Sequence, residues 1–210
     1  PGPDGRSIVF LRTADCAVEA ELDTGRYLRP HYVERGQSGL LYVTAEQDRA
    51  ILIVDPRERS VVDTIPTGSS NTHFFVLSPD EQRIYTSNIG DRSLSVLDVP
   101  GRRLLRTVDA GASNQRMTLS PDGRWFVTNL WQSGKVAFYR TSDDQLDFQV
   151  AIQGAPFVSR FSPDGRWLYN MGIAPQGSQP TGIRVWRIDT ATRAVAATSV
   201  DALGVGTGSL

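Results

Sequence analysis

The tripeptide Ser-Pro-Asp occurs three times, starting at Ser78, Ser120 and Ser162, so that successive copies lie 42 residues apart. Self-similarity with a period near 40 residues is typical of a β-propeller, in which each repeat is a blade of four short strands. Proline presets φ at the second position of a turn, and aspartate bonds the backbone two residues further on. The repeated turn therefore predicts an all-β fold built from four-stranded blades.

The clearest repeat runs from 73 to 111. Alternating or continuous apolar runs, separated by turn residues, predict four strands in it. These expected strands are 74–77, 83–87, 93–97 and 103–108.

The same pattern divides the whole chain into one propeller domain, 1–210. The expected blades are 1–28 (partial), 29–70, 71–112, 113–154, 155–203 and 204–210 (the start of the next). We expect about four complete blades, with partial ones at both ends, as part of a ring of six to eight blades and most simply seven. Residues 205–210 are expected to begin an inner strand. The last complete repeat is longer than the others, and its Pro/Gly-rich stretch 174–180 is expected to form a loop between the second and third strands.

Composition excludes several classes of protein. Lys and Arg total 22 and Asp and Glu total 23, which leaves a net charge of −1 and no basic or acidic stripe for a nucleic-acid or membrane-surface partner. No apolar run approaches the roughly 18 residues that a membrane-spanning helix needs. The first residues do not read as a signal peptide. Cys16 is the single cysteine, so the chain holds neither an internal disulfide nor a cysteine-based zinc site.

The two histidines, His31 and His73, are separated by one 42-residue repeat. Both stand at the expected start of an inner strand, beside the central channel of a propeller. Two imidazoles there could bind a metal, haem or an anion, or act as acid and base. Alternatively, each could simply bond to the backbone of a neighbouring blade. The matching positions, Gln115 and Phe157, lack ligand character, which excludes a symmetric metal ring in these blades.

Two arginines, Arg116 and Arg160, occupy inner-strand positions that are apolar in the repeat 74–77. A buried guanidinium without a partner is costly, so each arginine should either form an ion pair or reach water. One interpretation is an anion site in which both arginines, with His73, hold a carboxylate or phosphate. The other is a salt bridge between blades, with Glu34 or an acid elsewhere in the ring.

Short motifs give a further comparison. Leu41-Tyr42-Val43-Thr44 and Phe126-Val127-Thr128-Asn129 lie in expected second strands, and Leu97-Asp98 and Ile188-Asp189 close third strands. Together with the Ser-Pro-Asp turns, they resemble the YVTN-repeat propellers over essentially the whole chain. That group includes surface-layer and YncE-like proteins, lactonase-type propellers and the haem d1-type propeller of some nitrite reductases.

The resemblance is specific for fold and not for activity, because its motifs are turn and core residues. It implies a bacterial or archaeal protein, periplasmic or extracellular, whose ligand or partner meets one face of the ring. We expect a non-enzymatic scaffold that binds a small anionic ligand or a protein partner, without a cofactor, nucleic acid or membrane span. The alternative is an enzyme, either a lactonase-type hydrolase or an oxidoreductase, that uses haem or a divalent metal at the channel in the full-length protein. The candidate ligand-binding residues are His31, His73, Arg116 and Arg160.

Overall fold

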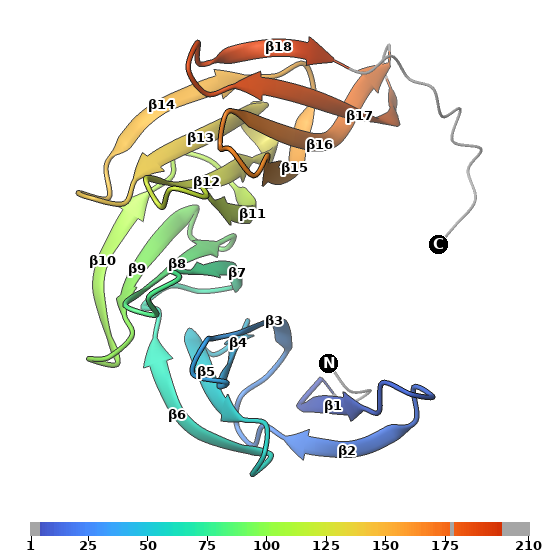
Figure 1. Ribbon diagram of the computed structural model, residues 1–210, viewed down its shortest axis with the longest axis vertical. Coiled ribbons are helices and arrows are strands. Elements are labelled where there is room, and N and C mark those ends of the chain that lie inside the picture. The colour runs from blue at the N-terminus through green and yellow to red at the C-terminus, as the bar shows by residue number, and fades with distance from the viewer. Residues whose placement is uncertain (1–4, 177–178, 199–210) are drawn as a thin grey trace. The chain divides into compact units, whose positions relative to one another are not determined.

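A computed structural model describes residues 5–176 and 179–198, and within them nearly all regular structure is β-strand (Figure 1). The chain forms two compact units, residues 1–109 and 110–210, which are described separately below. Each unit consists of antiparallel sheets whose strands follow one another in chain order. The predicted all-β architecture of four-stranded repeats is confirmed.

The first unit holds one two-stranded and two four-stranded sheets among its described residues. The two-stranded sheet pairs β1 (Ser7–Leu11) with β2 (Val18–Asp23). The next sheet contains β3 (Pro30–Arg35), β4 (Leu41–Ala45), β5 (Ala50–Asp55) and β6 (Ser60–Pro66). The third contains β7 (Thr72–Leu77), β8 (Arg83–Asn88), β9 (Ser93–Asp98) and β10 (Arg103–Asp109).

The described part of the second unit holds two four-stranded sheets and one short 3-10 helix, η1 (Trp131–Ser133). The first sheet contains β11 (Asn114–Leu119), β12 (Trp125–Leu130), β13 (Lys135–Arg140) and β14 (Leu146–Ala151). The second contains β15 (Ala155–Phe161), β16 (Trp167–Gln176), β17 (Gln179–Asp189) and β18 (Ala194–Thr198).

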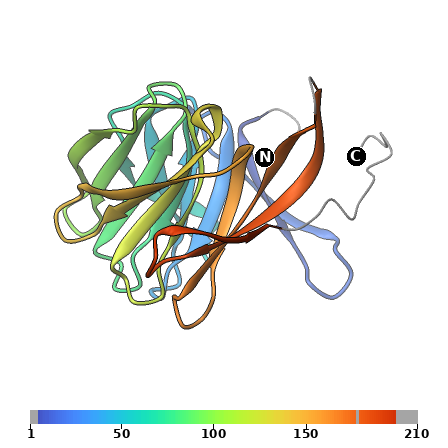
Figure 2. The same ribbon diagram turned by 90° about the horizontal axis from the view of Figure 1, so that it is seen from above.

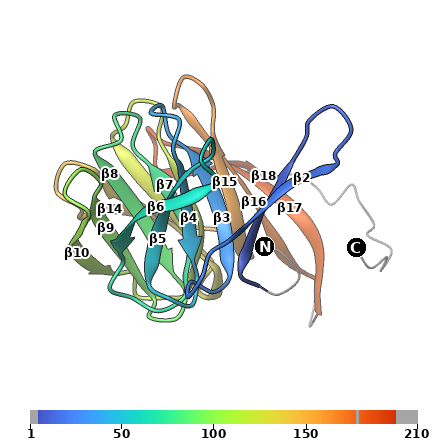
Figure 3. The same ribbon diagram turned by 90° about the horizontal axis from the view of Figure 1, so that it is seen from below.

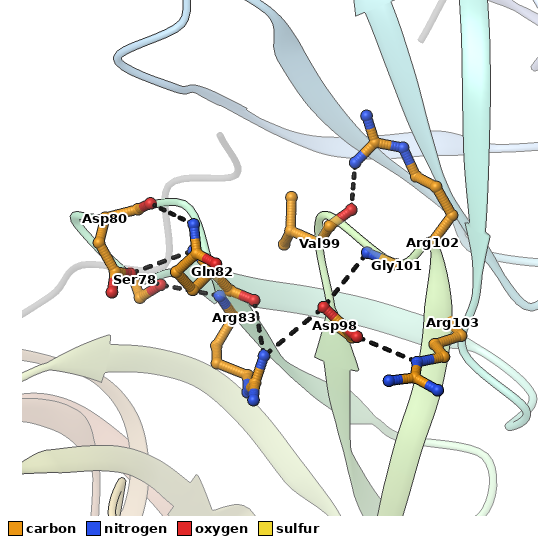
Figure 4. Close-up of polar contacts among 9 residues, drawn as sticks. All are labelled: Ser78, Asp80, Gln82, Arg83, Asp98, Val99, Gly101, Arg102 and Arg103. Carbon is orange, nitrogen blue, oxygen red and sulfur yellow. Dashed lines mark hydrogen bonds and ion pairs between the residues drawn. The ribbon is translucent and has the colours of Figure 1, made fainter.

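The Ser-Pro-Asp turn joins the first and second strands of three sheets and has the same hydrogen bonds in each copy. In the first copy, Ser78 Oγ donates to Asp80 Oδ1 at 2.6 Å and accepts from Arg83 N at 2.9 Å, while Gln82 N donates to Asp80 Oδ1 at 3.1 Å (Figure 4). Serine and aspartate thus satisfy the backbone that leads into the second strand. Because these contacts are local, the turn recurs wherever the tripeptide does.

Neighbouring sheets within each unit pack against each other through buried apolar side chains. In the first unit, Ile51 and Ile53 of β5 share a core with Phe75 of β7 and Leu97 of β9, and the strands of the two sheets lie side by side in Figures 1 and 3. In the second unit, Phe138 and Trp186 belong to one core formed by both sheets. Burial of such apolar faces is the main stabilisation of a sheet that cannot bury both faces alone.

One prediction for the last repeat is wrong. The Pro/Gly-rich stretch 174–180 was expected to be a loop, but β16 and β17 continue into it, with Pro175 paired to Pro180 and Gln176 paired to Gln179. These two strands, in orange and red in Figure 2, have 10 and 11 residues. The antiparallel pairing therefore prevails over the local preference of proline and glycine for loops. The strand expected at 205–210 lies outside the described residues.

Candidate functional site

The structure places the imidazoles of His31 and His73 side by side in the first unit. Each histidine is the second residue of its strand, β3 or β7. The ring centroids are 4.2 Å apart, the ring planes are inclined by 31°, and Nδ1 of His31 lies 3.2 Å from the carbonyl oxygen of His73. Since a carbonyl oxygen can only accept, this contact requires the proton on Nδ1 of His31.

Glu46 holds the second imidazole. It directly follows β4, its side chain is 4% exposed, and its Oε1 lies 2.9 Å from Nδ1 of His73. A carboxylate accepts, so His73 also donates through Nδ1. Arg29 Nη2 lies 3.2 Å from Oε2 of the same carboxylate, close enough for an ion pair but without the alignment of a hydrogen bond. Glu46 is thereby buried between an imidazole and a guanidinium, the latter with 56% of its side chain exposed.

The surroundings of His31 favour its neutral form. Burial lowers the pKa of His31 below its ordinary value of 6.5, and positive charge on His73 lowers it further. The Glu46 carboxylate acts in the opposite direction and does not fully offset these effects. At neutral pH, His31 therefore presents a lone pair on Nε2, while its Nδ1–H is held by the carbonyl.

The sequence analysis missed Glu46 and Arg29. The backbone N–H of Glu46 donates to Arg29 O at 3.1 Å, and in the next sheet Ile89 N donates to Asn71 O at the same distance. Glu46 thus occupies the place that an apolar isoleucine takes one repeat later. The sequence signal for this site was an acidic residue at a repeat position that is otherwise apolar. Its role is clear only from the structure, where Glu46 lies beside His73.

The two predicted arginines belong to the second unit, and both are exposed. Arg116 lies at a bulge in β11, with its guanidinium carbon 5.3 Å from the centroid of the Phe157 ring. Arg160 lies on β15, opposite Tyr169 of β16. Because both arginines are exposed to water, neither of them imposes the free-energy cost of burying a charge. The four predicted site residues thus form a histidine pair in one unit and two arginines in the other.

Metal-binding clusters of three or more His, Cys, Asp or Glu side chains are absent from the residues that the structure describes. The exposed Cys16 is a free thiol. Among the described residues, the histidine pair therefore offers two imidazole nitrogens and no third ligand of these types.

Four-stranded antiparallel sheets that repeat along the chain are the blades of a β-propeller. A comparison with protein families matches residues 35–156 to the family described as YncE-like β-propeller. The chain belongs to this YncE-like β-propeller family. No curated protein matched the sequence.

Solved structures share this fold. One is hydrazine synthase of Kuenenia stuttgartiensis, with a TM-score of 0.74 and 19% sequence identity. The match covers 81% of the present chain and 49% of that chain, so the present chain corresponds to about half of its length. At this level of identity the similarity concerns the fold alone.

In the part of the chain that the structure describes, no helix has the length and apolar character required to cross a membrane.

Proposed function

We propose that the protein is a non-enzymatic binding scaffold that takes a small anionic ligand at one face, with Arg116 and Arg160 as its cationic contacts. The observation that supports this proposal is the exposure of both arginine residues on the first strands of neighbouring sheets. A guanidinium offers a planar set of donors that matches carboxylates and phosphates.

The arrangement of the strands also supports it. β11 and β15 lie side by side within the second unit (Figure 1). The backbone at Arg116 is held in place, since Nδ2 of Asn129 donates to its carbonyl oxygen at 2.7 Å and to that of Phe157 at 3.3 Å. The strand that carries Arg116 is therefore fixed before a ligand binds, which limits the backbone entropy lost on binding.

Calorimetric titration with inorganic phosphate and with succinate tests the proposal. We expect heat of binding for at least one anion, weakened about tenfold in Arg160→Gln and in Arg116→Gln, and weakened by added salt. Arg57→Gln, a change at an exposed arginine of the first unit, is the matched control and should bind as the wild type does. Absence of binding by the wild type, or equal affinity in all variants, would overturn the small-anion proposal.

A protein partner with acidic side chains is the second candidate for the same arginines, because the same guanidinium chemistry recognises surface carboxylates.

Membership of the YncE-like family supports a periplasmic or extracellular location for the protein. Fractionation of the producing cells tests the location. Recovery of the protein in the cytosolic fraction alone would contradict it.

A further inference from the structure

We propose that His31 and His73 together bind one divalent transition-metal ion through their Nε2 atoms. This inference concerns the first unit and does not depend on the anion site proposed for the arginines of the second.

Both imidazole rings are oriented by a hydrogen bond at Nδ1. Nδ1 of His31 donates to the carbonyl oxygen of His73, and Nδ1 of His73 donates to the carboxylate of Glu46. Metal-bound histidines in proteins usually give their other N–H to a backbone carbonyl or a carboxylate, which fixes the tautomer and makes the ligand more basic. Both kinds of partner occur here. Nε2 is thereby the nitrogen of each ring that remains for a metal, and neither Nε2 forms a hydrogen bond with a described residue.

The separation of the two rings also fits a shared ion. Two imidazoles bound at right angles to one ion, with metal–nitrogen bonds of about 2.0 Å, have ring centroids about 4.5 Å apart. The centroids of His31 and His73 are 4.2 Å apart. The two rings are therefore as close together as two imidazoles that share one ion, and the proposed site forms when rotation of the side chains turns both Nε2 atoms toward it.

Space and charge beside His31 also suit a cation. A cavity of about 200 Å³ lies beside that imidazole between β1 and β3, and His73 is not among the residues that line it. The β1 residues that line it, Ser7, Ile8 and Val9, carry no charge. The Glu46 carboxylate offsets part of the positive charge of an ion, and Arg29, in turn, pairs with that carboxylate.

The ligand chemistry selects the ion. Imidazole nitrogen suits Cu²⁺, Ni²⁺ and Zn²⁺, whereas Mg²⁺ and Ca²⁺ prefer oxygen. Affinity at a given nitrogen site rises from Ni²⁺ to Cu²⁺ and falls again at Zn²⁺. We therefore expect Cu²⁺ to bind most tightly and Mg²⁺ to leave the pair unoccupied.

Titration of the purified protein with Cu²⁺, Ni²⁺, Zn²⁺ and Mg²⁺ tests this site, in a Cys16→Ser background that removes the exposed thiol. We expect one Cu²⁺ per chain, with electron paramagnetic resonance couplings from two imidazole nitrogens. His31→Gln and His73→Gln should each weaken binding at least about tenfold, and Glu46→Gln, which keeps both ligands, by about tenfold.

Two controls keep the outcome interpretable. Urea denaturation shows whether each variant is folded, and Glu58→Gln, a change at an exposed carboxylate of the same unit, should bind Cu²⁺ as the parent does. Unchanged affinity in the folded His31→Gln/His73→Gln double variant, or a copper spectrum without imidazole coupling, would overturn the proposal. Failure of this site leaves the phosphate and succinate titrations unaffected, so the two proposals fail separately.

Discussion

Asn170 Nδ2 donates a hydrogen bond of 2.6 Å to Oδ1 of Asn129, joining the second strands of two neighbouring sheets across 41 residues of sequence. Ser159 Oγ donates to the same oxygen at 2.8 Å, and Asn129 Nδ2 donates to two backbone carbonyls. All three side chains are buried. Asn129 is therefore the centre of a polar network inside the second unit.

Asn129→Ala should lower the free energy of unfolding by about 2–3 kcal/mol, because it leaves buried donors and acceptors without partners. Urea denaturation followed by circular dichroism measures the change. Gln153→Ala, at an exposed residue of the same unit, is the control and should shift stability by no more than about 0.5 kcal/mol. Equal stability of the two variants would show that the network contributes nothing.

The lowered pKa of His31 predicts a pH dependence of stability. The unfolded chain, with a pKa near the ordinary 6.5, binds a proton more readily than the folded chain, so protonation favours unfolding. The contribution of His31 is fully present above about pH 6.5 and is lost as pH falls through the lower folded-state pKa. His31→Gln should therefore lose less stability than the wild type between about pH 7.5 and about pH 5.5. Identical losses would contradict the prediction.

The charge of Glu46 raises the pKa of His31, although burial and His73 prevail over it. Glu46→Gln should therefore lower the pKa of His31 further. Nuclear magnetic resonance titration of the imidazole protons measures it directly, since the chain has only 2 histidines. Glu58→Gln removes an exposed carboxylate from the same unit and should leave the pKa unchanged. A higher His31 pKa in Glu46→Gln would show that the carboxylate acts in the opposite sense.

The Ser-Pro-Asp turns predict a stability effect at Ser78. Two hydrogen bonds hold the pKa of Asp80 below its ordinary value of 3.8. The larger effect comes from the Ser78 hydroxyl and the smaller from the backbone N–H of Gln82. Ser78→Ala removes one donor and one acceptor and should lower the free energy of unfolding by about 1 kcal/mol. It should also raise the pKa of Asp80, measurable by carbon-detected titration. Ser113→Ala, outside any such turn, is the control, and equal effects of the two substitutions would refute a role for the turn.

Asp147 predicts a further stability effect in the second unit. Its Oδ2 accepts a 2.9 Å hydrogen bond from the indole N–H of Trp125, a side chain that is almost fully buried. Asp147→Ala leaves that N–H without its partner and should lower the free energy of unfolding by about 1–3 kcal/mol. Asp147→Asn retains an acceptor and should cost less. A larger loss in Asp147→Asn than in Asp147→Ala would be inconsistent with this account.

Features set by neighbouring residues could be predicted from the sequence. The bonds of Ser78 reach no further than Arg83, so the tripeptide alone specifies the turn. Its 42-residue recurrence then predicts the repeated sheets. The same register placed His31 and His73 at equivalent positions, and the structure shows their rings close together and tilted by 31°.

Tertiary structure decided what depends on groups far apart in the chain. Glu46 binds His73, which lies 27 residues further along the chain. The repeat pattern does not predict that Glu46 is buried beside Arg29. Pairing of Pro175 with Pro180 extends two strands through a stretch whose composition suggested a loop. Local hydrogen bonds are encoded by residue type at short spacing, whereas burial and cross-strand pairing depend on which distant segments meet. The amino-acid sequence by itself therefore determined the repeated fold, and only the folded chain determined the surroundings of its polar side chains.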